Sequence, residues 1–264
     1  TLCKNRSIRV YTIQHGSLGV DGPIVREEFF FFGGLPIVSD QILAWGDVTK
    51  NTCIEFGVDK NKINIVGSLT HRKFFEARKT TQNTGYVLLA AVSPSNDNLI
   101  NDLLIEKKQK YEEFIVQVCK ISRKLGKKLV IKTHPKQNEY DISHLVKNFQ
   151  PYVEVVHQGD TLDLISKCDV FLCTDFSTTI IEAHILGKPT IVISVKDYLH
   201  DSEVYRAKSC IQCNIDTLEQ NLSRLLSDKS IREDLIRRGN DVVDRYFANQ
   251  TTSCKKAVDF LGTN

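Results

Sequence analysis

Short polar segments that could bind phosphate or move protons follow four of the apolar runs in this chain. The first is His15-Gly16, after the apolar run Ile8 to Ile13. An imidazole can act as a general base or donate a hydrogen bond to phosphate, and the adjacent glycine lets a ligand approach the backbone. A histidine that ends a strand with a local hydrogen bond would look the same. The residues alone favour neither interpretation of His15.

The second and third segments follow the apolar runs 86–92 and 128–133. Ser93 and Ser95 form a Ser-Pro-Ser-Asn sequence after the first run, where doubly wound folds often bind phosphate. No G-x-G-x-x-G pattern is present there, so an ordinary turn is the preferred interpretation. After the second run, Pro135 holds the backbone of His134 extended, which fixes a ring that could donate to a phosphate or a leaving group. The alternative is a strand-ending turn in which His134 has no role.

The fourth segment, residues 173–179, is the most informative. Its sequence, CTDFSTT, gathers hydroxyls and free backbone amides where a helix is predicted to begin, and such a place is suited to an anion. The candidate ligands are Thr174, Asp175, Ser177, Thr178 and Thr179. A capping box of Thr179 and Glu182 would instead satisfy the helix start without a ligand. A cap uses one hydroxyl and three lie in a row, so we favour a ligand; Glu182 could accept hydrogen bonds from ribose hydroxyls.

The elements between these segments predict an α/β fold. Strands are predicted over 8–13, 42–45, 63–66, 86–92, 128–133, 153–156, 170–173 and 190–194, and helices over 49–56, 108–125, 161–167, 179–186, 217–226, 231–238 and 242–261. Short apolar strands alternating with helices indicate a doubly wound, Rossmann-like parallel sheet, whose ligands bind beyond the carboxyl ends of the strands. Residues 79–85 (KTTQNTG) have the composition of a linker. We therefore predict one domain over 1–78 and a second over 86–264.

Composition excludes several classes of protein. With 41% hydrophobic and 25% charged residues the 264-residue chain is neither disordered nor fibrous, and a net charge of +3 is too small to indicate nucleic acid. No apolar run approaches the roughly 18 residues of a membrane-spanning helix. The Cys210-x-x-Cys213 pair has no second pair, so we predict no metal site and expect reduced cysteines in a cytoplasmic protein. The chain contains no methionine and starts at Thr1, so either its start has been processed away or it is a piece of a longer protein; we expect the natural protein to continue upstream.

The order of several short motifs resembles a known group of enzymes. These motifs are Gln14-His15-Gly16, Trp45-Gly46-Asp47, Val66-Gly67-Ser68, Thr133-His134-Pro135, Thr174 to Thr178 and Gly187-Lys188-Pro189. Together they resemble the GT-B-fold transferases of cell-surface polymers, which include CDP-glycerol glycerophosphotransferases and capsule or polysialic-acid glycosyltransferases with a His-Pro motif. The segment Cys168 to Ile193 matches best. Phe176 stands where the glycerophosphotransferases have tyrosine, and Thr178 where they have a second serine.

The resemblance implies a GT-B-like fold whose C-terminal half, with the donor site, is complete and whose N-terminal, acceptor-side half is partial. It implies an enzyme that moves a glycosyl or polyol-phosphate group from a nucleotide-sugar or CDP-polyol donor to a polysaccharide or lipid-linked acceptor. His15 would be the base, with Gly16 and Ser68 in the acceptor-side loop. His134, Ser177 and Thr178 would hold the donor phosphates. Such a mechanism needs neither a metal nor a cofactor, because the activated donor is itself a substrate.

Two alternatives remain. The segment Thr174 to Ala183 is similar to one in the non-hydrolysing UDP-N-acetylglucosamine 2-epimerases, in which Glu182 would match the ribose-binding glutamate. Ser177 and Thr178 stand where those epimerases have two glycines, so the epimerase ranks second. The third hypothesis is a nucleotide-binding domain without turnover. The sequence leaves open the nucleotide, the acceptor, the oligomeric state and any attachment to the inner face of the membrane.

Overall fold

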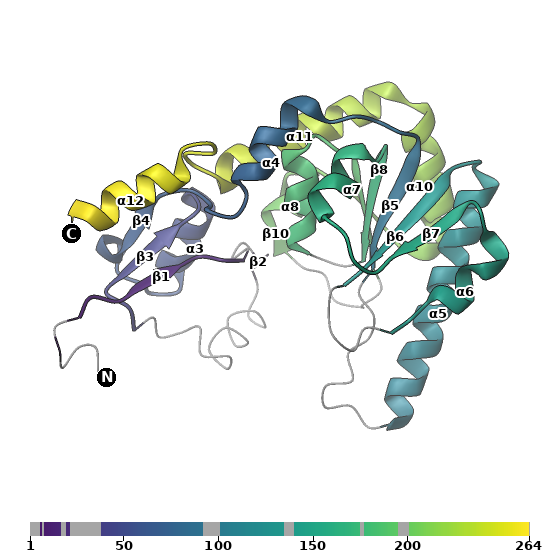
Figure 1. Cartoon of the computed structure of the whole chain (residues 1–264), viewed down its shortest axis with the longest axis horizontal. Coiled ribbons are helices and arrows are strands. Elements are labelled where there is room, and N and C mark those ends of the chain that lie inside the picture. Colours follow the sequence, from purple (N-terminus) through teal and green to yellow (C-terminus); the bar gives the residue numbers. More distant parts are fainter. Residues whose placement is uncertain are drawn as a thin grey trace.

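The computed structural model describes residues 6, 8–16, 20–21, 38–91, 101–134, 140–174, 177–194 and 201–263. In these residues the chain forms two parallel sheets that lie side by side and are joined by helices along one edge (Figure 1). A short antiparallel pair, β2 (Val20–Asp21) with β10 (Asp201–Ser202), also joins segments that are far apart in the sequence. We call the part around the first sheet the small half and the part around the second sheet the large half.

The large half is the doubly wound domain that the alternation of apolar runs predicts. Its strands are β5 (Tyr86–Ala91), β6 (Lys128–Thr133), β7 (Val153–Val156), β8 (Val170–Thr174), β9 (Thr190–Ile193) and β11 (Ile211–Cys213). They are parallel in the order β11-β9-β8-β5-β6-β7. The strands are apolar along most of their length because helices cover both faces, and the side chains at Leu88 and Leu89 point to different cores.

Helices α5 (Asn101–Lys124), α6 (Ser143–Val146) and α10 (Ile215–Ser227) supply residues to the core on one face of this sheet. Helices α7 (Thr161–Lys167), α8 (Thr178–Ile185) and α11 (Lys229–Tyr246) supply most of the helical residues on the other face, together with the short α9 (Glu203–Arg206). Two single 3-10 turns, Lys60–Lys62 and Lys147–Phe149, precede β4 and β7.

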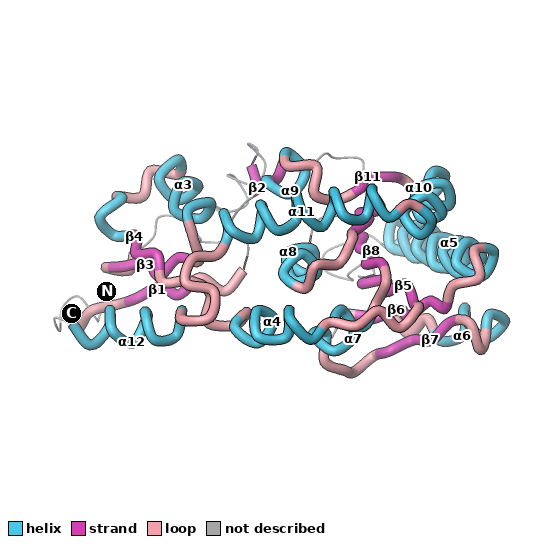
Figure 2. The backbone as a smooth tube through the Cα atoms, turned by 90° about the horizontal axis from the view of Figure 1, so that it is seen from above, coloured by secondary structure: helices cyan, strands magenta, loops and turns pink. Residues whose placement is uncertain are grey.

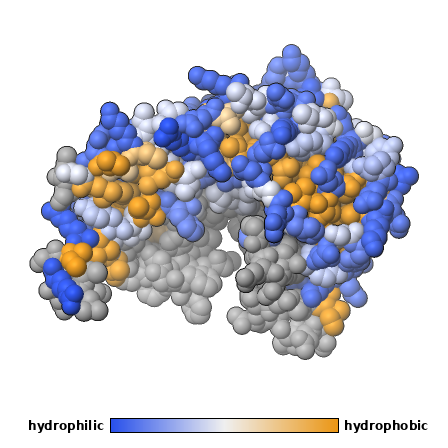
Figure 3. Space-filling model, viewed as in Figure 1, coloured by the Kyte–Doolittle hydropathy of each residue, from blue (hydrophilic) through white to orange (hydrophobic). Residues whose placement is uncertain are grey.

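The small half has three parallel strands, β1 (Tyr11–Ile13), β3 (Gln41–Ala44) and β4 (Ile63–Ile65), in the order β1-β3-β4. Helix α3 (Asp47–Glu55) covers one face, where Cys53 packs against Ile42 and Ile63. Helix α12 (Ser253–Thr263) covers the other face, where Ala257 packs against Leu43. Hydrophobic side chains accordingly gather in separate patches over the two halves (Figure 3).

The C-terminal helices differ from the sequence expectation. A break was expected between helices over 231–238 and 242–261, yet α11 continues through Gly239 and ends at Tyr246. Gly239 lies inside α11 and allows this helix to pack closely on α8. A Cβ at this position would lie 3.1 Å from Cγ of His184. Moreover, α12, which the proposed boundary assigns to residues 86–264, packs on the small half, where the rings of Phe260 and Tyr11 are 6.2 Å apart.

Two connections cross between the halves. One is α4 (Arg72–Ala77) with its 3-10 extension Arg78–Thr80, followed by the segment 81–85, which lies along the large half because Lys188 Nζ donates to Gln82 O and Asn83 Oδ1. The other is residues 246–252, which we call the return crossing. Figure 2 shows α8 between the two helices, with α11 on one side and α4 on the other. The two connections between the halves therefore pack on opposite sides of α8.

The return crossing lies directly on the loops of the small half. Phe247 stacks on Trp45 with ring centroids 5.3 Å apart, and the amide of Ala248 donates to the carbonyl of Trp45. A Cβ on Gly46 would stand 2.4 Å from the carbonyl oxygen of Tyr246, so no larger residue fits there without moving the backbone. Glycine in the Trp45-Gly46-Asp47 motif thus permits a close backbone approach.

Candidate functional site

An open pocket of about 540 Å³ lies between the two halves. The small half contributes His15 and Gly16 after β1, and four residues around the start of α4: Thr70, His71, Lys73 and Phe74. The large half contributes residues 159–161, between β7 and α7, and two residues of α8, Thr178 and Glu182. Each contributing segment follows the carboxyl end of a parallel strand or begins the next helix, which is where ligands bind in α/β sheets.

The loop that carries His15 is held by the neighbouring Gln14. The buried Gln14 side chain accepts a hydrogen bond from the amide of Trp45 and donates one to the carbonyl of Gly16, both at 2.8 Å. The indole Nε1 of Trp45 donates to the carbonyl of Gln14 at 3.0 Å. His15 itself is exposed at the pocket wall. A solvent-accessible imidazole on an anchored loop can accept a proton from a bound hydroxyl group.

The start of α8 is capped by Ser177. Its Oγ accepts a hydrogen bond from the amide of Thr179 at 3.4 Å and another from the Thr179 hydroxyl at 3.0 Å. The expected alternative, a capping box of Thr179 and Glu182, is therefore wrong: three successive hydroxyl residues fit a cap equally well by sequence, and the backbone places Ser177 at the cap. Thr178 is the hydroxyl residue of this segment that lines the pocket.

His71 is the main feature of the pocket that the sequence analysis missed. Its Nδ1 lies 2.7 Å from Ser68 Oγ, and its Nε2 lies 3.7 Å from Oε1 of Glu182. The serine, histidine and glutamate are thus arranged in line. Ser68 is only 2% exposed, so its hydroxyl cannot reach a substrate carbonyl and the arrangement is not a hydrolytic triad. Inspecting the residues after the predicted strand 63–66 as far as position 71 would have identified this histidine.

Lys73 also lines the pocket and was not predicted. Its Nζ lies 3.7 Å from Oδ1 of Asp160, and both side chains are more than half exposed, so this ion pair contributes little to stability. Lys73 therefore remains able to turn toward an anionic ligand.

The site residues that the sequence predicts fall into three groups in the structure. His15, Gly16, Thr178 and Glu182 come together in the pocket, with Ser68 behind His71. Ser177 and Thr179 make the cap, Thr174 is buried at the end of β8, and His134 is exposed at the end of β6; none of these lines the pocket. Ser93, Ser95, Pro135 and Asp175 lie outside the described residues.

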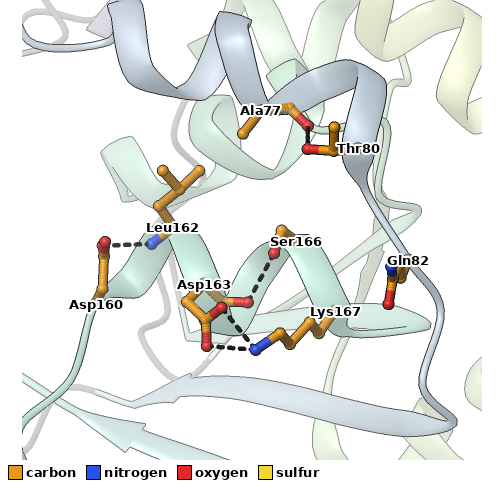
Figure 4. Close-up of a pocket in the computed structure, with 8 residues that line it drawn as sticks. All are labelled: Ala77, Thr80, Gln82, Asp160, Leu162, Asp163, Ser166 and Lys167. Carbon is orange, nitrogen blue, oxygen red and sulfur yellow. Dashed lines mark hydrogen bonds and ion pairs between the residues drawn. The ribbon is translucent and has the colours of Figure 1, made fainter.

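A second pocket, of about 350 Å³, lies beside α7 and the segment after α4 (Figure 4). Several of its polar side chains bond near neighbours: Asp160 accepts from the amide of Leu162, Lys167 pairs with Asp163 at 2.7 Å, and Thr80 donates to the carbonyl of Ala77. Because these groups already satisfy one another, we assign the candidate site to the larger pocket.

The described residues contain no group of three or more His, Cys, Asp or Glu side chains that could hold a metal ion. None of the helices that the structure describes is long and apolar enough to cross a membrane. Cys119, Cys173, Cys210 and Cys213 are buried free thiols.

The fold is that of GT-B enzymes. A putative UDP-N-acetylglucosamine 2-epimerase from Listeria monocytogenes superposes with a TM-score of 0.65 and 13% identity, over 99% of this chain and 69% of that one. The wall teichoic acid polymerase TagF superposes with a TM-score of 0.61 and 15% identity, over 97% of this chain and 69% of that one. The UDP-GlcNAc 2-epimerase of Neisseria meningitidis bound to UDP-GlcNAc superposes with a TM-score of 0.62 and 15% identity, over 99% of this chain and 72% of that one. At these identities the likeness establishes the fold alone.

No curated protein matches the sequence. A family model does match it, from residue 2 to residue 207, which includes both sheets except β11 and every residue that lines the pocket between the halves. The resemblance to GT-B surface-polymer transferases is thereby confirmed at the level of the family: the chain belongs to the LIC12162 family of transferases.

Proposed function

We propose that this transferase moves a glycosyl or polyol-phosphate group from a nucleotide-activated donor to a surface-polysaccharide or lipid-linked acceptor. One observation supports the proposal above the others. The pocket brings an exposed histidine of the small half, His15, to the side of the α8 start, with Thr178 and Glu182, in the large half. A general base and a polar helix start that line one pocket suit group transfer from a nucleotide.

In this proposal the large half binds the donor. The first turn of α8 presents the Thr178 hydroxyl to the phosphates, and the helix dipole favours negative charge there. The leaving nucleotide gains negative charge on its phosphate oxygens as the bond to the transferred group breaks, and fixed donors stabilise that charge without reorganising. Glu182, one turn further into α8, accepts hydrogen bonds from the ribose hydroxyls. His134, at the end of β6, remains a predicted donor to the phosphates.

The small half binds the acceptor. His15 takes the proton of the acceptor hydroxyl as that oxygen attacks, a contribution of about 10² to 10⁴ in rate for a well-placed base. Gly16 keeps the approach to His15 free of a side chain. Closure of the two halves over the substrates would exclude water from the pocket. We also place the reaction in the cytoplasm, at the inner face of the membrane if the acceptor is lipid-linked.

The first experiment is isothermal titration of the protein with UDP-, CDP- and CMP-linked donors. We expect at least one donor to bind, and Thr178→Val and Glu182→Gln to weaken it. His15→Ala should keep the binding affinity and lose the transfer activity, and His144→Ala is the matched control, because His144 is also an exposed histidine but lies on α6, outside the pocket. Failure of every donor to bind would refute the proposal.

The same preparation separates the alternative functions. Conversion of UDP-N-acetylglucosamine to its manno epimer without any acceptor would identify a 2-epimerase and refute group transfer. Tight nucleotide binding with every donor left intact, across lipid-linked and polysaccharide acceptors, would identify a binding domain.

A further inference from the structure

His71 is buried at the back of the proposed donor site. It is 4% exposed, and three aromatic rings surround it: Trp45, Phe74 and Phe247 have ring centroids 4.8, 5.7 and 5.1 Å from that of the imidazole. A polar ring in an apolar cage requires hydrogen-bond partners at its two nitrogens. Ser68 is the partner at Nδ1, and the carboxylate of Glu182 lies near Nε2.

The position of the proton on His71 depends on the direction of the hydrogen bond with Ser68. When the Ser68 hydroxyl donates to Nδ1 across the 2.7 Å contact, the neutral ring carries its own proton on Nε2. That N–H faces Oε1 of Glu182, with Nε2 and Oε1 3.7 Å apart, which is longer than a hydrogen bond. The Glu182 side chain is 18% exposed, so one part of the carboxylate faces the buried imidazole and another remains open to the pocket.

The turn that carries Ser68 and His71 is held in place by the C-terminal part of the chain. Ser253 Oγ donates to the carbonyl of Ser68 at 2.7 Å, and Gly67 lies so close to the return crossing that a Cβ would stand 2.3 Å from the carbonyl oxygen of Ala248. The imidazole is therefore fixed by the small half, whereas the carboxylate it faces belongs to the large half. Such support from behind is what keeps a binding group in one orientation.

We infer that His71 is a positioning residue that orients the Glu182 carboxylate toward the ribose hydroxyls of the donor nucleotide. The inference rests on the proposed function, in which Glu182 binds that ribose. Ser68 acts one step further back, by fixing which nitrogen of His71 carries the proton. Thr70 Oγ1, 3.3 Å from Nδ1, is a weaker second partner for the same nitrogen.

The test compares nucleotides that have the ribose hydroxyls with nucleotides that lack them. UDP and CDP, and the 2′,3′-dideoxy form of each, are titrated into the wild-type protein, His71→Phe, Glu182→Gln and the double variant. A phenyl ring suits the aromatic cage, so His71→Phe should fold; His71→Leu is the second variant if it does not. Thermal unfolding is measured for each variant, and His144→Phe is the matched control outside the pocket.

We expect Glu182→Gln to weaken the ribonucleotide by about tenfold to a hundredfold, the usual effect of hydrogen bonds to a charged group. His71→Phe should weaken it by about fivefold or more and leave the dideoxy nucleotide unchanged. The double variant should be no weaker than Glu182→Gln alone, because the two residues act on the same hydrogen bonds. A residue with a merely structural role would weaken both forms of the nucleotide equally.

Three results would contradict the positioning role of His71 or the proposed function. If Glu182→Gln discriminates between the two forms and the folded His71 variants do not, the positioning role is wrong and the proposed function stands. If the His71 variants lose affinity for both forms equally, His71 is structural. If the wild-type protein binds neither UDP nor CDP, nor any of their donors, the proposed function fails and the positioning role fails with it.

Discussion

Replacing Gly67 by alanine should destabilise the protein far more than the same change at Gly57. Both glycines have left-handed backbone conformations, with φ of +90° at Gly67 and +83° at Gly57. An alanine Cβ at position 57 would meet no atom within 4 Å. At position 67 it would stand 2.3 Å from the carbonyl oxygen of Ala248 and 2.8 Å from Cβ of Ser253. Gly57→Ala therefore measures the backbone strain alone, whereas Gly67→Ala adds the steric overlap with Ala248 and Ser253.

The two costs can be estimated separately. A non-glycine residue in the left-handed region costs about 1–2 kcal/mol, and this cost applies at both positions. The overlap at position 67 involves backbone that cannot turn away like a side chain, so overpacking adds at least the usual ~1–3 kcal/mol there. For a chain of this size ~1 kcal/mol lowers the melting temperature by about 2–4 °C. We therefore expect a shift of about 2–8 °C for Gly57→Ala and about 4–20 °C for Gly67→Ala, with the second clearly larger in paired measurements.

The assay is thermal and urea-induced unfolding of both variants beside the wild-type protein, followed by nucleotide titration of the folded proteins. Gly67→Ala should also weaken nucleotide binding, because displacing the turn moves Ser68 and the His71 that it holds. Gly57→Ala should bind as the wild type does. Equal stability of the two variants would refute the close approach of the return crossing to Gly67.

Three further outcomes follow from buried groups. Burial lowers the pKa of His184 from 6.5 to about 4, so the unfolded chain binds this proton first as the pH falls. The free energy of unfolding should therefore decrease between pH 6.5 and 4 by up to roughly 3 kcal/mol. The denaturation midpoint of His184→Gln should fall less steeply over this range. Lys188→Met removes the donor to Gln82 and Asn83, so limited proteolysis within residues 79–85 should become faster while the unfolding midpoint changes little. Burial raises the pKa of Cys119 and Cys168 to about 12 and of Cys213 to about 11, whereas Cys254 is half-buried; among these four, Cys254 should react first with iodoacetamide, as followed by mass spectrometry.

The large sheet could be predicted from the sequence because a strand covered on both faces must be apolar throughout. The strands 128–133 and 153–156 and the helix 161–167 form at the residues expected. The long C-terminal helix could not be placed, because glycine within a helix and glycine at its end look alike in sequence. Only the fold shows that Gly239 faces His184.

Part of the candidate site could be predicted for a similar reason. Strand ends and hydroxyl residues are visible locally, which is how His15, Thr178 and Glu182 were found. His71 is different, since its cage is built by residues 45, 74 and 247, which are far apart in the chain. A lone histidine three residues after a Gly-Ser pair carries no local sign of that environment.

Some of the residues that hold the site in place come from a different stretch of the chain than the residues that line it. Every residue that lines the pocket lies within residues 2–207, the range that the family model matches. The turn of Ser68 and His71 is held partly from within that range, where the Gly67 amide donates to the carbonyl of Ala44, and partly from beyond it, through Ala248 and Ser253. Helix α11 packs on α8 and α3, and α12 packs on the small sheet, so the C-terminal helices connect the two halves rather than covering only one. If His71 orients Glu182 as we propose, the C-terminal residues Ala248 and Ser253 help to hold the histidine that does so.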